Sequence, residues 1–130
     1  MADQIRVIVG ELTEFTEKAI ARVGVNITAN LIETTPVDTG WARANWVPAI
    51  GTPFIVPSPN EGSGAGTASR RSRQEQGTAS LTGYKLGRGP VFITNNVPYI
   101  TELNEGSSFQ APAAFVQAAI AQGVKDSGGS

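Results

Sequence analysis

The longest periodic run of apolar positions lies in the first quarter of the chain. Leucine, phenylalanine, alanine, valine and isoleucine side chains recur there at intervals of three, then four residues, at Leu12, Phe15, Ala19, Val23, Ile27 and Leu31. This spacing is typical of one face of a helix and predicts a helix over residues 11–34, about 35 Å long. Glu14 and Lys18 lie one turn apart on its polar side in the order that favours an ion pair. Packing against a sheet is the first interpretation of the apolar face, and a groove for a partner is the second.

The residues before this helix have a different pattern. Residues 5–9 are a β-branched run interrupted by Arg6 and followed by Gly10. Such a run predicts a short strand, and fusion with the helix that follows is the alternative.

The helix is predicted to end at a corner, which we define as residues 35–46. Pro36 lacks a backbone N–H and disfavours the helical conformation at Thr35, so the helix should stop there. Turn and capping residues follow at Asp38, Thr39 and Gly40. Trp41 and Trp46 then supply the largest apolar surfaces of the chain, so we expect them to close the core or a seam between subunits.

Short strands are expected after the corner. Residues 46–50 and 54–56 are candidate strand pieces, which Pro48 and Pro53 restrict to sheet edges or bulges. Residues 91–95 alternate between two faces and predict a strand of about five residues. Residues 84–86 are its candidate hairpin partner across a Gly-rich turn.

The last quarter of the chain is predicted to be mostly helical. A short helical turn over residues 99–104 should be closed by Gly106, and Pro112 should open a final helix that runs to about Val124. Residues 126–130 are a polar tail. Together these elements predict one α+β domain over residues 1–130, in which a long N-terminal helix and a C-terminal helix pack on a small, mostly antiparallel sheet.

Residues 57–83 differ in composition from the rest, because Gly, Ser, Thr, Ala and Pro dominate them. We expect a long extended arm here, which lies outside the core and can be removed without unfolding the subunit. Its basic cluster, Arg70, Arg71 and Arg73, is the best binding candidate, because guanidinium groups suit phosphates and carboxylates equally. A solvated loop, a salt-bridging arm to another protein and a DNA contact all fit this cluster. No aromatic residue is interleaved with it, which disfavours base stacking.

Composition excludes much chemistry. The chain has no His and no Cys, so neither Ser-His-Asp nor Cys-His catalysis nor an ordinary zinc site can be built. Asp38, Glu102 and Glu105 are possible catalytic carboxylates, but capping and a solvated helical turn explain them equally well. Residues 62–67 resemble a phosphate-binding loop without its lysine, a preceding strand or a following helical pattern. We therefore expect no catalytic activity, no cofactor and no metal.

The charge and hydropathy of the chain set limits on its partners and location. A formal net charge of -1 gives no global field for nucleic acid or anionic lipid. No apolar run approaches the roughly 20 residues that span a bilayer, and no secretion signal is evident at the start. We expect a protein of the cytoplasm without a membrane partner.

Two blocks taken together resemble a known family. The first is the corner, TPVDTGWARANW, and the second runs from Asn96 through NVPYITELNEGSS to the segment APAAFV. In this order they resemble the tail-completion or neck proteins of long-tailed bacteriophages, of the minor tail protein Z type. That family has a T-P-x-D-T-G-x-x-R corner, a P-Y motif that leads to E-x-G, and a final helix opened by proline.

The resemblance implies a non-enzymatic structural subunit of the virion, assembled in the host cytoplasm. It would form a ring, expected to be a hexamer, that completes the tail and joins it to the head connector. Its implied partners are other copies of itself, head connector or stopper proteins, and tail terminator or tail tube proteins, with passive contact to DNA in the lumen. The candidate interaction residues are Arg70, Arg71, Arg73, Trp41, Arg43, Trp46, Tyr99 and Glu102. The alternative is a DNA-contacting neck or packaging accessory protein that uses the arginines of the arm.

Overall fold

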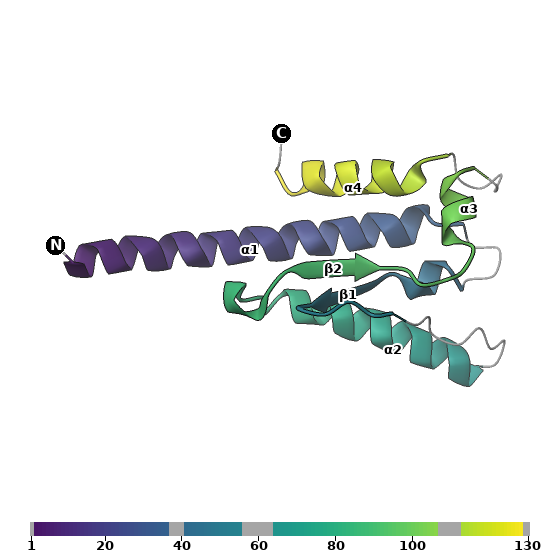
Figure 1. Ribbon diagram of the computed structural model, residues 1–130, viewed down its shortest axis with the longest axis horizontal. Helices are drawn as coiled ribbons and strands as arrows, with labels where there is room; N and C mark the ends of the chain where they lie inside the picture. The colour runs from purple at the N-terminus through teal and green to yellow at the C-terminus, as the bar shows by residue number, and fades with distance from the viewer. Residues whose placement is uncertain (1, 37–40, 56–63, 107–112, 129–130) are drawn as a thin grey trace.

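The computed structural model describes residues 2–36, 41–55, 64–106 and 113–128. The helices are α1 (Ala2–Thr34), α2 (Gly64–Leu81), α3 (Ile100–Asn104) and α4 (Phe115–Asp126), and the strands are β1 (Val47–Ile50) and β2 (Val91–Thr94) (Figure 1). Two 3-10 turns, η1 (Arg43–Asn45) and η2 (Leu86–Arg88), precede the strands. The prediction of an α+β fold with long N-terminal and C-terminal helices and an antiparallel sheet is confirmed.

Helix α1 is longer than the sequence pattern predicted. It spans 33 residues, about 50 Å, and includes residues 5–9, so the strand predicted there is wrong and the alternative of fusion with the helix is right. The physical reason is that strand preference depends on a neighbouring strand, whereas an existing helix extends at little cost. The predicted stop is confirmed, because α1 ends at Thr34, two residues before Pro36. The proposed cap residues at 38–40 lie outside the described residues.

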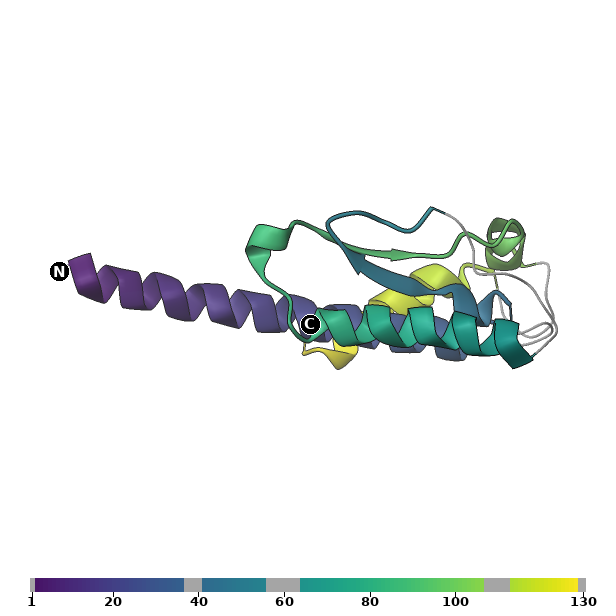
Figure 2. The ribbon, with the colours of Figure 1, turned by 90° about the horizontal axis from the view of Figure 1, so that it is seen from below.

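The sheet has two strands. β1 and β2 are antiparallel, with Val47 opposite Thr94 and Ile50 opposite Val91. The hairpin predicted between residues 84–86 and β2 is wrong, because the chain curls into η2 and the Tyr84 hydroxyl donates to the Gly89 carbonyl at 2.7 Å. Residues 54–55 form no strand. β1 lies against α2, while β2 lies beside α1, so both helices support the sheet (Figure 2).

The predicted extended arm is wrong for residues 64–81, which form α2. This helix packs so closely on β1 that a Cβ at Gly77 would lie 2.5 Å from the Pro48 carbonyl oxygen. Leu81 is fully buried against α1 at Gly24, where an added Cβ would lie 3.1 Å from its Cδ1. Tertiary contacts therefore stabilise a helix whose own sequence favours it little. Because α2 is part of the body, we now expect its removal to unfold the subunit.

Helix α4 packs antiparallel along the C-terminal half of α1 (Figure 1). It starts at Phe115, after Ala114 in the left-handed conformation, rather than at Pro112, which lies outside the described residues. Gly123 allows the close approach, since a Cβ there would lie 2.7 Å from Ile27 Cα. Leu31, Trp46 and Ala119 form the centre of the core at this contact. The first interpretation of the apolar face, core packing, is thus confirmed for this half of α1.

Candidate interaction surfaces

The corner is anchored in the core by Trp46. Its ring is 5% exposed, and its Nε1 donates a hydrogen bond of 2.7 Å to Thr35 Oγ1, whose own hydroxyl donates to the Leu31 carbonyl. Both residues are buried, and these hydrogen bonds satisfy the indole N–H and the hydroxyl group inside the protein. The prediction that Trp46 closes the core is confirmed, and its side chain is therefore a packing residue.

Trp41 lies at the surface beside another candidate residue. Its ring meets that of Tyr99 edge to face, with centroids 5.7 Å apart, and both side chains are partly exposed. This geometry is favourable for an aromatic pair. The corner and the P-Y motif, which are far apart in the sequence, therefore share one surface.

Helix α2 fastens the corner from the other side. Gln74 Nε2 donates to the carbonyl oxygens of Arg43 and Trp46, both at 3.1 Å. Arg43 therefore contributes to the fold through its backbone carbonyl, which links the corner to α2. Glu102 lies in α3 with an exposed side chain, and Asp38 lies outside the described residues, so the predicted carboxylate pair is not tested.

The arginine cluster lies within α2 rather than on an extended arm. The Arg73 guanidinium carbon is 5.1 Å from the centre of the Phe54 ring, a cation–π contact that links α2 to the segment after β1. Arg70 and Arg71 belong to the same helix.

Asn104 has a role that the sequence did not indicate. Its Oδ1 accepts a hydrogen bond from the Val116 N–H at 2.9 Å, and its backbone carbonyl accepts from the Ala114 N–H at 2.6 Å. It therefore caps α4 from a distance, satisfying an N–H that the helix itself leaves unpaired. Such a cap has no local signature, because its partner is twelve residues away.

The second surface is the N-terminal half of α1, which extends beyond the other elements (Figures 1 and 2). We call residues 2–16 the projection. It exposes large apolar side chains, each between 55 and 72% exposed, at Ile5, Val7, Ile8, Val9, Leu12 and Phe15. Six exposed large apolar side chains on one projecting helix are typical of a surface that binds a partner. The periodic pattern predicted that Leu12 and Phe15 pack in the core, and this part of the prediction is wrong.

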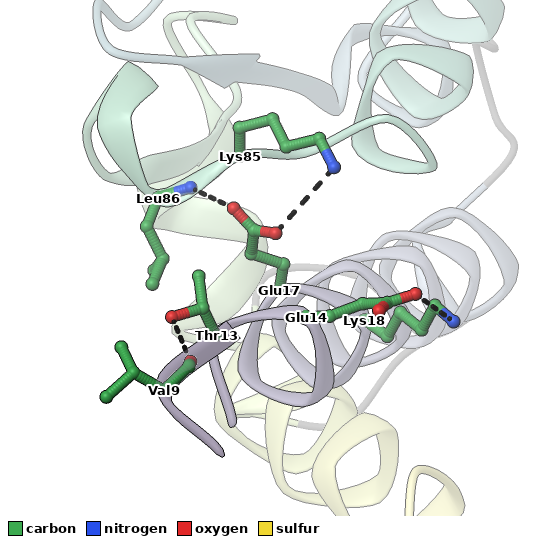
Figure 3. Close-up of polar contacts among 7 residues, drawn as sticks. All are labelled: Val9, Thr13, Glu14, Glu17, Lys18, Lys85 and Leu86. Atoms are coloured by element: carbon green, nitrogen blue, oxygen red, sulfur yellow. Dashed lines mark hydrogen bonds and ion pairs between the residues drawn. The ribbon is translucent and has the colours of Figure 1, made fainter. Parts of the chain in front are cut away.

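The base of the projection is held by a carboxylate (Figure 3). Glu17 accepts a hydrogen bond from the Leu86 N–H at 2.8 Å and lies 3.7 Å from Lys85 Nζ, with its side chain only 12% exposed. One turn away, the predicted pair of Glu14 and Lys18 is confirmed at 2.9 Å, with both side chains largely exposed. The hydrogen bond and charge of Lys18 lower the pKa of Glu14. The helix therefore leaves the body at Glu17.

An apolar groove lies next to this point. It has a volume of about 340 Å³, and its walls come from α1 at Ala19, Ile20, Val23 and Ile27 and from β2 at Val91 and Ile93. The groove continues the apolar stripe of the projection along α1. A helix or an extended apolar segment fits a surface of this kind.

The described residues contain no group of three acidic, His or Cys side chains placed to hold a metal ion. A helix does begin at Gly64, within the phosphate-loop-like segment, but the lysine of such a loop is absent. Within the same described ranges, every helix is too short or too polar to cross a bilayer.

Comparisons with known proteins do not identify the chain. No family model, no curated protein and no solved structure matches it.

Proposed function

We propose that this chain is a non-enzymatic structural subunit of a phage neck, which forms a ring that completes the tail and joins it to the head connector. The observation that carries the proposal is the projection. A helix with six large apolar side chains in solvent is suited to a subunit whose neighbours cover it. The ordered resemblance of the corner and the P-Y block to tail-completion proteins supplies the particular assembly.

The corner surface supports the same proposal. Trp41 and Tyr99 pack together, and Glu102 lies in α3, at the end of the molecule where α1 finishes (Figure 1). Exposed aromatic side chains next to basic and acidic residues are typical of protein interfaces. We assign this surface, with Arg70, Arg71 and Arg73, to contacts with the neighbouring neck and tail proteins.

The mass of the purified full-length protein tests the proposal. Native mass spectrometry and light scattering should give a closed oligomer of more than two copies, six by the resemblance, and electron microscopy should show rings. A monomer at about 100 μM, or a closed dimer only, would contradict the ring.

Binding to DNA separates the proposal from its alternative. A DNA-contacting protein that uses three arginines should bind duplex DNA with an affinity that falls with salt at a logarithmic slope of about −2.7. The structural role predicts no such binding at physiological salt. Fluorescence anisotropy with labelled duplex, compared between the wild type and a variant with Arg70, Arg71 and Arg73 changed to Ala, makes the decision.

A further inference from the structure

The projection carries an ordered stripe. Ile5, Ile8, Leu12, Phe15 and Ala19 follow one another at intervals of three and four residues, so they lie along one line of α1. This is the seven-residue pattern by which two helices pair in a coiled coil. Val7 is equally apolar and 59% exposed, but it lies on another side of the helix.

The same side of α1 is covered by α4 farther along the chain. That cover ends over Asn26, whose Nδ2 donates to Ser127 Oγ at 2.8 Å just after the end of α4. Before Asn26 come the groove and then the projection, and the described part of the chain covers neither of them. The free length from Ala2 to Val25 is about 36 Å.

We propose that the α1 of a second copy of this chain lies antiparallel along this free length and ends in the groove, in line with α4. The projection cannot fold back into the groove of its own chain, since the projection and the groove wall belong to one continuous helix. A parallel arrangement in the same register is blocked, because the C-terminal half of the second α1 would lie where α4 already packs. The contact and the proposed function both require that copies of the chain associate, and they have no other assumption in common.

The heptad pattern allows antiparallel registers that differ by seven residues, and the length of the free segment selects one of them. Ile8 of one copy lies opposite Ala19 of the other, and Leu12 lies opposite Phe15. Ala2 then lies opposite Val25, next to the point where α4 ends, so the free length and the partner helix match. Glu11 of one copy lies beside Lys18 of the other, which gives opposite charges along the flank of the seam.

The area and charge of the surface favour a second copy over a membrane. A helix pair of this length, with the groove, buries on the order of 1,500 Å², the size of a stable interface. An amphipathic helix that binds anionic lipid needs a basic polar face. Residues 3–18 instead carry more acidic than basic side chains, with Asp3, Glu11, Glu14 and Glu17 against Arg6 and Lys18.

Engineered disulfides test the contact directly, because the chain has no cysteine of its own. In the full-length protein, Ile8→Cys combined with Ala19→Cys should give covalently linked copies on mild oxidation, seen on a non-reducing gel. Val7→Cys combined with Ala19→Cys is the matched control and should stay unlinked. Linking of the control to the same extent, or no linking of the Ile8 pair, would overturn the proposal.

The same samples distinguish this inference from the ring. Linked copies together with a wild-type mass of two would support the contact and contradict the ring. A ring mass without linking would leave the proposed function intact and refute the contact.

Charge substitutions give a second, independent measurement. Ile8→Asp should weaken self-association at least about a hundredfold in sedimentation, because it buries an unpaired carboxylate. Val7→Asp should change it by less than about threefold, and circular dichroism should show both variants folded. Association unchanged by Ile8→Asp, or a wild-type protein that stays monomeric and floats with phosphatidylcholine–phosphatidylserine vesicles, would refute the second copy.

Discussion

Replacing Gly123 by Ala tests the packing of α4 on α1, on which the position of the groove depends. The added Cβ would lie 2.7 Å from both Cα and Cγ1 of Ile27 and 2.8 Å from its N. Carbon atoms in proteins pack at about 3.5–4.0 Å, so the two helices must separate by roughly 0.8 Å or more. Two of the three clashing atoms are backbone, which no change of rotamer can move away.

Two opposing terms set the size of the effect. Forcing a close-packed contact apart costs about 1–3 kcal/mol, and a gap of this size forfeits a quarter or more of the dispersion attraction across it. Alanine is favoured over glycine within a helix by about 1 kcal/mol. We therefore expect a net loss of about 1 kcal/mol in the free energy of unfolding, which lowers Tm by about 3–6 °C for a chain of this size.

Urea unfolding followed by tryptophan fluorescence is a suitable assay, because Trp46 lies in the core beside this contact. The measurement is best made in an Ile8→Asp background, so that association does not add to the apparent stability. Gly10→Ala is the matched control: nothing lies within 4 Å of its added Cβ, and it should gain up to about 1 kcal/mol. If Gly123→Ala is as stabilising as Gly10→Ala, the close approach of α4 to Ile27 is wrong.

Three further substitutions test the polar contacts. Thr35→Val leaves the buried Trp46 N–H without its acceptor and should cost about 1–3 kcal/mol in urea unfolding, while Thr34→Val, on the exposed side, should cost under about 0.5 kcal/mol. Hydrogen bonds from Gln122 and then Asn30 lower the pKa of Asp126 below 3.8, so Asn30→Ala should raise it toward that value in an NMR titration. Because the pKa of Asp126 is lower in the folded than in the unfolded protein, these hydrogen bonds stabilise the fold above pH 3.8. Their contribution is lost as the pH falls through the pKa of the folded protein. A pKa of Asp126 that does not change in Asn30→Ala would show that the contact to Asn30 does not form. Glu17→Ala should speed hydrogen exchange of the Leu86 amide, whereas Glu14→Ala should leave it unchanged, and equal rates in both would contradict the anchor at the base of the projection.

The elements that the sequence predicts correctly depend on local signals. Pro36 ends α1 by its own geometry, the alternation of residues 91–94 marks β2, and Glu14 and Lys18 pair across a single turn. Each of these effects acts over a few residues and needs no knowledge of what lies nearby. The pattern of such signals is sufficient for the fold class.

Helix α2 could not be predicted in this way. The face it presents to β1 and the corner uses Gln74, Gly77 and Leu81, of which only Leu81 is apolar. The spacing of three and four residues is present on this face. A search for periodic apolar residues does not detect it, because the face is made mostly of small and polar residues. The composition of residues 57–83 therefore indicated an extended arm, whereas at Gly77 the small side chain allows the close packing of α2 on β1.

The candidate surfaces also depend on contacts between residues that are far apart in the sequence. The corner and the P-Y motif drew attention to Trp41 and Tyr99 separately, but only the fold brings their rings together. Asn104 caps α4 through a contact that no local pattern contains.

The apolar stripe of α1 is buried over one half of the helix and exposed over the other. The difference follows from the lengths of the helices that could cover it. Ile27 and Leu31 pack toward α4 and the core, whereas Leu12 and Phe15, on the same periodic line, are exposed. Periodicity reports that a face must be covered without reporting which chain covers it. Helix α1 is about 50 Å long, while α4 and α2 reach only about 18 Å and 27 Å, and both lie beside its C-terminal half. The described elements of one chain are thus too short to cover the whole stripe, and the second copy that we propose has a helix of the length and spacing that the remainder requires.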